Sequence, residues 1–219
     1  MKKFAMFLIC FVCLFSCGGC ENKIGSKQIL NNMAEITSVY YFGENEDFYC
    51  VVECGEREEP YILNGVREKV VPFALLTISF FGGNDNDVLS VNLLVDEKQI
   101  LVECEKNQMN GDFVCDTELE LSGNEKICVS FENYSIELVA VSNDFVCDKN
   151  QIIDIVCKNF QEELSTFFEC GCECYLKVLN GKKNGFDDFF WCFSCVNTKN
   201  KNFSAVISTT TGEIVAKKV

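Results

Sequence analysis

The chain has 219 residues, of which 48% are hydrophobic and 24% charged, a composition typical of one large or two small globular domains rather than of a disordered protein. Its formal net charge of −14, without any cluster of Lys and Arg, argues against nucleic-acid binding because phosphate backbones would repel it. The absence of histidine excludes the commonest general base and the Ser-His and Cys-His nucleophile pairs.

Residues 1–20 have the pattern of an export and lipid-attachment signal. Two lysines precede an apolar run that is too short to span a bilayer, and small residues follow it. The segment Leu14-Phe15-Ser16-Cys17 resembles the lipobox of bacterial lipoproteins, which implies cleavage after Ser16 and lipid on Cys17. An ordinary secretory signal and an uncleaved membrane anchor are the alternatives. All three place the remaining chain outside the cytoplasm, either secreted or, as a lipoprotein, on the outer face of the cytoplasmic membrane.

This interpretation makes 1–16 a signal peptide and 17–34 a tether, followed by a first domain over 35–143. In that domain, short apolar or alternating runs are separated by turn pairs such as Asn64-Gly65 and Asn110-Gly111, and no helical pattern intervenes. The pattern predicts an antiparallel β-sandwich of immunoglobulin-like architecture. The expected strands are Ile36–Phe42, Phe48–Cys54, Phe73–Phe81, Val88–Val95, Gln99–Glu105, Phe113–Leu121, Lys126–Phe131 and Ser135–Val141.

Residues 144–219 are expected to form a second domain, in which one helix packs on an antiparallel sheet. Asp148 and Gln151 have the spacing of a capping box, and apolar residues then recur every four positions, which predicts a helix over 149–168. The fold class is therefore mainly β, with an α+β second domain. The expected strands of this domain are Cys174–Leu179, Phe189–Val196, Phe203–Ser208 and Ile214–Val219.

The order of a helix followed by strands, ending in the segment from Ala205 to Val215, resembles the PepSY-like family of envelope domains. Such domains end in a strand, a polar Thr-Gly turn and a final strand. In this chain Ser208-Thr209-Thr210 stands where the family often has an aspartate. The resemblance implies a noncatalytic domain that binds partners or modulates peptidases, and no catalytic residue carries over. A generic α+β unit is the alternative.

Twelve cysteines follow the signal region, and Cys157 among them lies in the predicted helix. An even number in an exported chain favours disulfides, whereas cysteines inside apolar strand-like runs also fit plain core packing. The candidates for disulfide formation are Cys50, Cys54, Cys104, Cys115, Cys128, Cys147, Cys170, Cys172, Cys174, Cys192 and Cys195.

The cysteines of 170–174, together with Cys192 and Cys195, are numerous enough to bind zinc, and Trp191-Cys192-Phe193-Ser194-Cys195 has the spacing of a WCxxC redox motif. The surrounding residues predict a strand, in which residues three apart point to opposite faces. A redox motif also needs a helix after its first cysteine, and the following residues are strand-like. We therefore expect neither a metal site nor a cofactor.

These observations predict a noncatalytic envelope lipoprotein that acts as a binding module. Its partner would be an envelope protein, a peptide or a polymer, and its lipid would attach it to the membrane. No residue is assigned a catalytic role. The alternative functions are an exported thiol-redox or carboxylate-based enzyme and a purely structural envelope protein.

Overall fold

A computed structural model of the chain describes residues 23–186 and 188–218, so that the expected signal peptide and Cys17 lie outside the described residues. All eight strands predicted within 35–143 are present, with shifts at their ends. They are β1 (Met33–Glu44), β2 (Phe48–Glu58), β3 (Val70–Phe80), β4 (Val88–Val95), β5 (Lys98–Lys106), β6 (Phe113–Thr117), β7 (Ile127–Phe131) and β8 (Tyr134–Ala140).

The last part of the chain also contains the predicted strands, and short helices precede and interrupt them. None of the helices in the described ranges has both the length and the apolar composition needed to span a membrane. Helix α2 (Ser26–Asn31) precedes β1. The elements that follow β8 are η1 (Val141–Asp144), α3 (Lys149–Asn159), α4 (Gln161–Glu169), β9 (Cys172–Asn180), η2 (Gly181–Asn184), β10 (Phe189–Asn197), β11 (Asn202–Ser208) and β12 (Ile214–Lys218).

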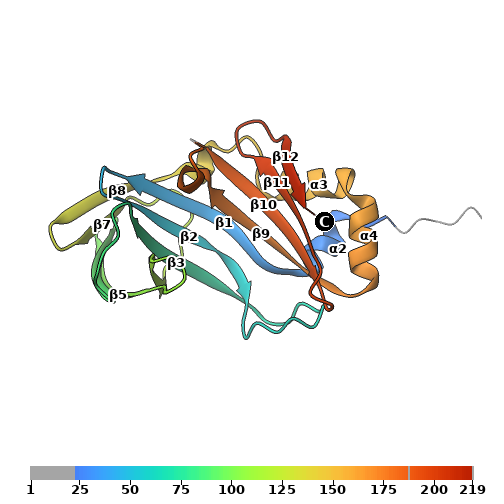
Figure 1. Ribbon diagram of the computed structural model, residues 1–219, viewed down its shortest axis with the longest axis horizontal. Helices are drawn as coiled ribbons and strands as arrows, with labels where there is room; N and C mark the ends of the chain where they lie inside the picture. The colour runs from blue at the N-terminus through green and yellow to red at the C-terminus, as the bar shows by residue number, and fades with distance from the viewer. Residues whose placement is uncertain (1–22, 187, 219) are drawn as a thin grey trace, which may run out of the picture.

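The strands form one continuous sheet in the order β12-β11-β10-β9-β1-β2-β3-β6-β5-β4-β7-β8 (Figure 1). An additional pairing between β8 and β1 closes the first eight strands into an antiparallel barrel, and β9–β12 extend the sheet beyond it. The predicted fold class, an immunoglobulin-like sandwich followed by a separate helix-on-sheet domain, is therefore wrong. The expected boundary between residues 143 and 144 falls within η1.

The error concerns how strands pair, because their positions were predicted well. Strand β3 pairs with β6 and β4 pairs with β7, so that Greek-key connections replace simple neighbour pairing. Strand β9 pairs in parallel with the start of β1, for example Ile36 with Leu176, and so joins the last strands to the barrel. Local alternation indicates where a strand lies and which residues share a face, but it does not indicate the partner strand.

Strand β1 belongs to both parts of the molecule. Its first residues pair with β9, while Tyr41 and Phe42 pair with β8, and the register against β2 shifts between Thr37 and Val39. One hydrophobic core fills the barrel and includes Tyr41. The other, which we call the helical core, lies between the helices and β9–β11 and includes Tyr40. Strands β1 and β2 thus contribute buried side chains to both cores.

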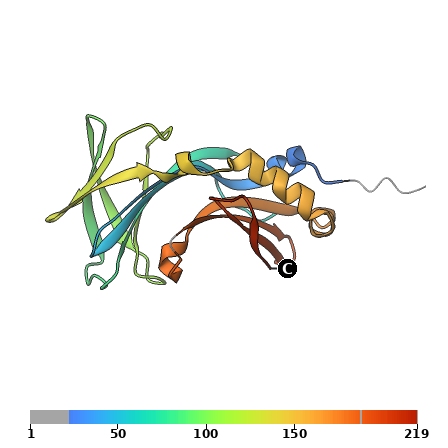
Figure 2. The same cartoon turned by 90° about the horizontal axis from the view of Figure 1, so that it is seen from above.

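The helices cover one face of the β9–β12 extension and lie at the end of the molecule away from the barrel (Figure 2). The capping box is confirmed, since the Asp148 carboxylate accepts hydrogen bonds from the backbone N–H groups of Asn150 and Gln151. The single helix predicted over 149–168 is two helices that meet at Phe160, which has φ −131° and ψ 37°. There the Gln161 side-chain amide donates to the carbonyl oxygens of Cys157 and Ile24.

Candidate functional site

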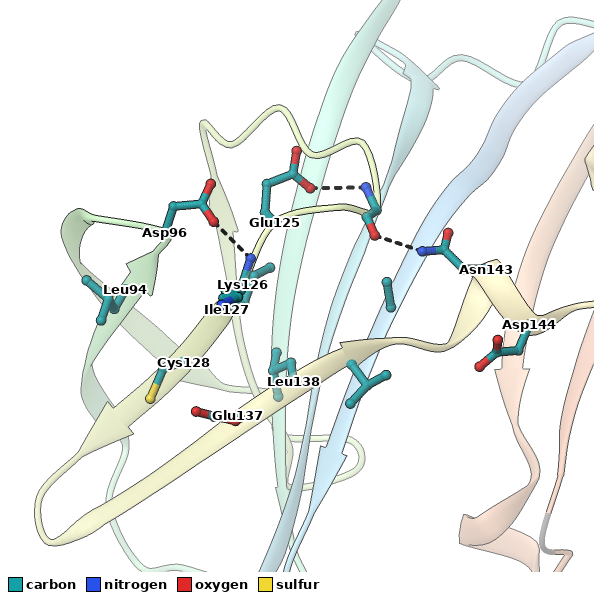
Figure 3. A pocket seen from close by; sticks show the side chains of 13 residues that line it. Leu94, Asp96, Glu125, Lys126, Ile127, Cys128, Glu137, Leu138, Asn143 and Asp144 are labelled. Carbon is teal, nitrogen blue, oxygen red and sulfur yellow. Dashed lines mark hydrogen bonds between the residues drawn. The ribbon is translucent and has the colours of Figure 1, made fainter.

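A hollow of about 620 Å³ lies on the outer wall of the barrel, where β7 and β8 meet the loop before β7 and the end of η1 (Figure 3). Strand β4 contributes Leu94 and the turn after it contributes Asp96, while β8 contributes Glu137 and Val139. Segments far apart in the sequence meet here because β4 pairs with β7 and β7 pairs with β8. We call this hollow the acidic groove.

The loop before β7 is organised around one carboxylate, that of Glu125. It accepts hydrogen bonds from the backbone N–H groups of Ser122, Gly123 and Asn124 and from the Tyr41 hydroxyl, at 2.7 to 3.1 Å. Burial by itself raises the pKa of Glu125, but the hydrogen bonds from Tyr41 and Ser122 outweigh burial and lower the pKa to about 2. Glu125 is therefore a fixed anion that holds its loop against β1.

Two further contacts fix the rim of the acidic groove. The Asp96 side chain accepts a hydrogen bond from the Lys126 backbone N–H at 3.0 Å, and the Asn143 amide donates to the Gly123 carbonyl at 2.8 Å (Figure 3). Gly123 has φ +94°, and a Cβ atom there would lie 2.9 Å from the Asn143 side chain. The positive φ therefore favours glycine at this position.

The acidic groove combines negative charge with exposed apolar side chains. Its carboxylates are those of Asp96, Glu125, Glu137 and Asp144, and Lys126 is the only cation among its described lining residues, so four negative charges face one positive charge. Within the described part of the chain, Glu137 and Asp144 are exposed and have no hydrogen-bond or ion-pair partner through their carboxylates. Leu94 and Val139 are 41% and 62% exposed. Such a surface can attract a cationic group and cover an apolar one.

The twelve cysteines of the described ranges are all free thiols, distributed over both cores and the surface. The eleven cysteines named as candidates for disulfide formation stay candidates. Cys50, Cys54 and Cys104 are buried in the barrel core, and Cys115 is half-buried beside Cys104. The cysteines at intermediate exposure are Cys115, Cys128, Cys147, Cys170 and Cys192.

Three thiols meet in the helical core. Cys172 and Cys174 of β9 and Cys195 of β10 have sulfur atoms that all lie within 4.8 Å of one another. The other two thiols form hydrogen bonds with the Cys172 sulfur, which lowers the pKa of Cys172 to about 4. The same interactions raise the pKa values of Cys174 and Cys195. The three shifts share one main cause, which is that the three sulfur groups interact with one another.

The strand context of the WCxxC segment is confirmed, because all of it lies in β10. Cys195 is fully buried among the helical-core residues, whereas Cys192 is half-buried and its thiol is 3.8 Å from the Ser194 hydroxyl. Burial raises the pKa of Cys192. The two cysteines therefore do not form the adjacent, low-pKa pair that redox catalysis requires.

Sequence reasoning missed the residues of the acidic groove. Asp96, Glu125 and Glu137 each stand in an ordinary polar turn or alternating strand, with no motif around them. The turn residues Ser122-Gly123-Asn124 were the only available signal, and they indicate a loop without indicating its carboxylate partner.

Comparison with known proteins gives no family for this chain. No protein-family model matches it, and neither the curated proteins nor the solved structures contain a significant match.

Proposed function

We propose that the protein is a noncatalytic, exported lipoprotein whose acidic groove binds a basic, partly apolar peptide segment of an envelope partner. The observation that carries this proposal is that one hollow contains both charged and apolar exposed groups. The carboxylates of Glu137 and Asp144, which have no partner among the described residues, lie there together with the exposed side chains of Leu94 and Val139. The net charge of −14 adds a long-range attraction for basic ligands. The lipobox-like segment ending in Cys17 supports attachment to the membrane.

The chemistry of the groove favours binding over catalysis. The Glu125 carboxylate already accepts hydrogen bonds from three backbone N–H groups, so it anchors its loop and does not act as a general base. The lack of histidine removes the residue that most often moves protons near neutral pH. A peptide with alternating lysine and leucine residues would place cations against the carboxylates and apolar side chains against Val139.

The binding proposal is tested with a fluorescent peptide of alternating lysine and leucine and the full chain, measured by fluorescence anisotropy. The double variant Glu137→Gln, Asp144→Asn should bind three- to tenfold more weakly, since each exposed charge pair contributes up to about 1 kcal/mol. Higher salt should weaken binding of the unmodified protein, because salt screens exposed charges.

The matched control is Glu103→Gln with Asp85→Asn, which removes two exposed carboxylates outside the groove. This control should leave the affinity unchanged. An equal loss in the control, or equal binding of a peptide with glutamate in place of lysine, would show that the groove is not a specific site.

Lipid attachment is tested separately by expression in a bacterium that processes lipoproteins. The unmodified chain should fractionate with membranes and carry lipid on Cys17 by mass spectrometry. Cys17→Ala should abolish both, whereas Cys20→Ala should change neither. Recovery of unacylated protein that still begins at Met1 would contradict the lipoprotein proposal.

A further inference from the structure

Three buried thiols converge between β9 and β10, on the side of the sheet that the helices cover. Cys172 and Cys174 are two residues apart on β9 and so share a face, and Cys195 is the direct cross-strand partner of Cys174. The exposed fractions of the three residues are 1%, 0% and 0%. This cluster lies in the core that contains Trp191 and Phe193, apart from the acidic groove.

The spacing of the sulfur atoms is compatible with a single metal ion shared by all three, whose sulfurs lie within 4.8 Å of one another. Around a thiophilic ion with metal–sulfur bonds of about 2.3 Å, adjacent sulfurs are separated by about 3.8 Å in a tetrahedron and about 4.0 Å in a trigonal plane. The observed separation between the sulfurs of Cys174 and Cys195 is 3.9 Å. A disulfide would need about 2.05 Å and would leave the third thiol of the cluster unpaired.

The set of donors selects the kind of ion. All three are thiols, and within the described residues no carboxylate or further thiol completes a larger group around them. Soft sulfur ligands favour Cu(I) and Zn(II) over Mg²⁺, Ca²⁺ or Mn²⁺. We propose that Cys172, Cys174 and Cys195 form a three-thiolate site for a thiophilic d¹⁰ metal ion, either Cu(I) or Zn(II).

Binding requires no redox step. Each coordinating thiol that still carries a proton releases it, every sulfur donates a lone pair to the ion, and no electron is transferred. Three ligands satisfy Cu(I), whereas Zn(II) prefers four, so that a fourth ligand would have to be enclosed together with the zinc ion. Because the cluster is shielded from water, the ion would be captured while the sheet and the helices assemble.

The test is refolding of the full chain under anaerobic, reducing conditions with Cu(I) or Zn(II), followed by removal of excess metal and competition with a chromophoric chelator. The unmodified protein should retain one tightly held equivalent, and X-ray absorption should report three sulfur ligands. The retained metal should also raise the midpoint of thermal unfolding. The same X-ray absorption spectra identify the ion, since copper should have three sulfur ligands and zinc should have three sulfur ligands and one lighter atom.

The variant Cys174→Ser should lose that equivalent and the thermal shift. The matched control Cys192→Ser, on the same β10 strand as Cys195 but half-buried, should retain both. If Cys174→Ser does not fold, Cys172→Ser at the start of β9 provides the same comparison. Equal metal retention in the unmodified protein and in Cys174→Ser, or in Cys172→Ser where that variant replaces it, would overturn the proposal. A Cys174–Cys195 disulfide in exported protein that gains no metal site after reduction would overturn it as well.

Discussion

Glu125 illustrates how a single side chain determines the shape of a loop. Three consecutive backbone N–H groups and the Tyr41 hydroxyl converge on its carboxylate, so that the loop before β7 is held against the barrel strand β1. Charge-assisted hydrogen bonds of this kind are roughly twice as strong as neutral ones. The rim of the acidic groove therefore depends on Glu125 being ionised.

The first prediction concerns acid stability. A folded-state pKa of about 2, below the value near 4.3 expected for an unfolded glutamate, means that ionised Glu125 stabilises the fold. This contribution is fully present above the unfolded pKa and is lost as pH falls toward 2. After allowance for solvent screening it is worth about 1 kcal/mol. Glu125→Gln should therefore lower the free energy of unfolding at pH 7 and flatten its decline below pH 4.3.

Urea unfolding at several pH values measures this effect. Glu97→Gln is the matched control, because Glu97 is exposed in the turn between β4 and β5. The control should follow the pH dependence of the unmodified protein. If Glu125→Gln and the unmodified protein lose stability in parallel between pH 4.3 and pH 2, the hydrogen-bonded carboxylate is not the acid-sensitive group.

At the scale of elements, β1 and β2 are paired strands that contribute buried side chains to both cores. The register between them shifts after Thr37, and Gly55 of β2 lies opposite this irregularity. A Cβ atom at Gly55 would lie 2.0 Å from the Ile36 carbonyl oxygen, which is backbone and cannot move aside like a side chain. Glycine at this position allows the close approach of the two strands.

The second prediction follows from this contact. Gly55→Ala should lower the free energy of unfolding by about 2 kcal/mol or more, because the added methyl group forces the two strands apart. Gly82→Ala is the control, since a Cβ atom at Gly82 meets no atom within 4 Å and Gly82 lies outside the positive-φ region. Thermal unfolding of both variants measures the difference. Equal midpoints for the two would mean that the strands accommodate the methyl group.

At the scale of the whole molecule, the sequence allowed prediction of elements but not of their assembly. Alternating residues between turn pairs gave the strands, and the spacing of Asp148 and Gln151 gave the start of α3. Barrel closure rests on pairs such as Tyr41 with Ala140, whose strands are separated by most of the first domain expected from the sequence. No local pattern encodes such a pairing, because it depends on the whole hydrophobic set being buried at once.

The candidate sites could not be predicted from the sequence for the same reason, because they depend on which strands pair. The spacing of Cys172 and Cys174 shows that they share a face of a strand, but only the register of β9 and β10 brings Cys195, rather than Cys192, beside them. The acidic groove likewise depends on strand pairing, because its side chains come mainly from β4, β7, β8 and η1, and β4 pairs with β7 while β7 pairs with β8. Prediction of these sites therefore required knowledge of which distant strands pair, more than it required sequence motifs.

The third prediction concerns whether the barrel and the extension unfold together. Strands β1 and β2 contribute buried side chains to both cores, so loss of the barrel should expose part of the helical core. Trp191, the single tryptophan, lies in the helical core and reports on it by fluorescence. Leu93→Ala opens a cavity in the barrel core and should cost about 2 to 5 kcal/mol.

We expect Leu93→Ala to lower the urea midpoints of Trp191 fluorescence and of far-UV circular dichroism by the same amount, because coincident transitions mark one cooperative unit. Leu101→Ala on the neighbouring strand β5 is the control, since Leu101 is 74% exposed and its truncation should leave both midpoints in place. A fluorescence midpoint that stays at its original value while the dichroism becomes biphasic would indicate two independent units divided near residue 143. Coincident shifts would instead show that the β1–β2 pair transmits a barrel defect to the helical core.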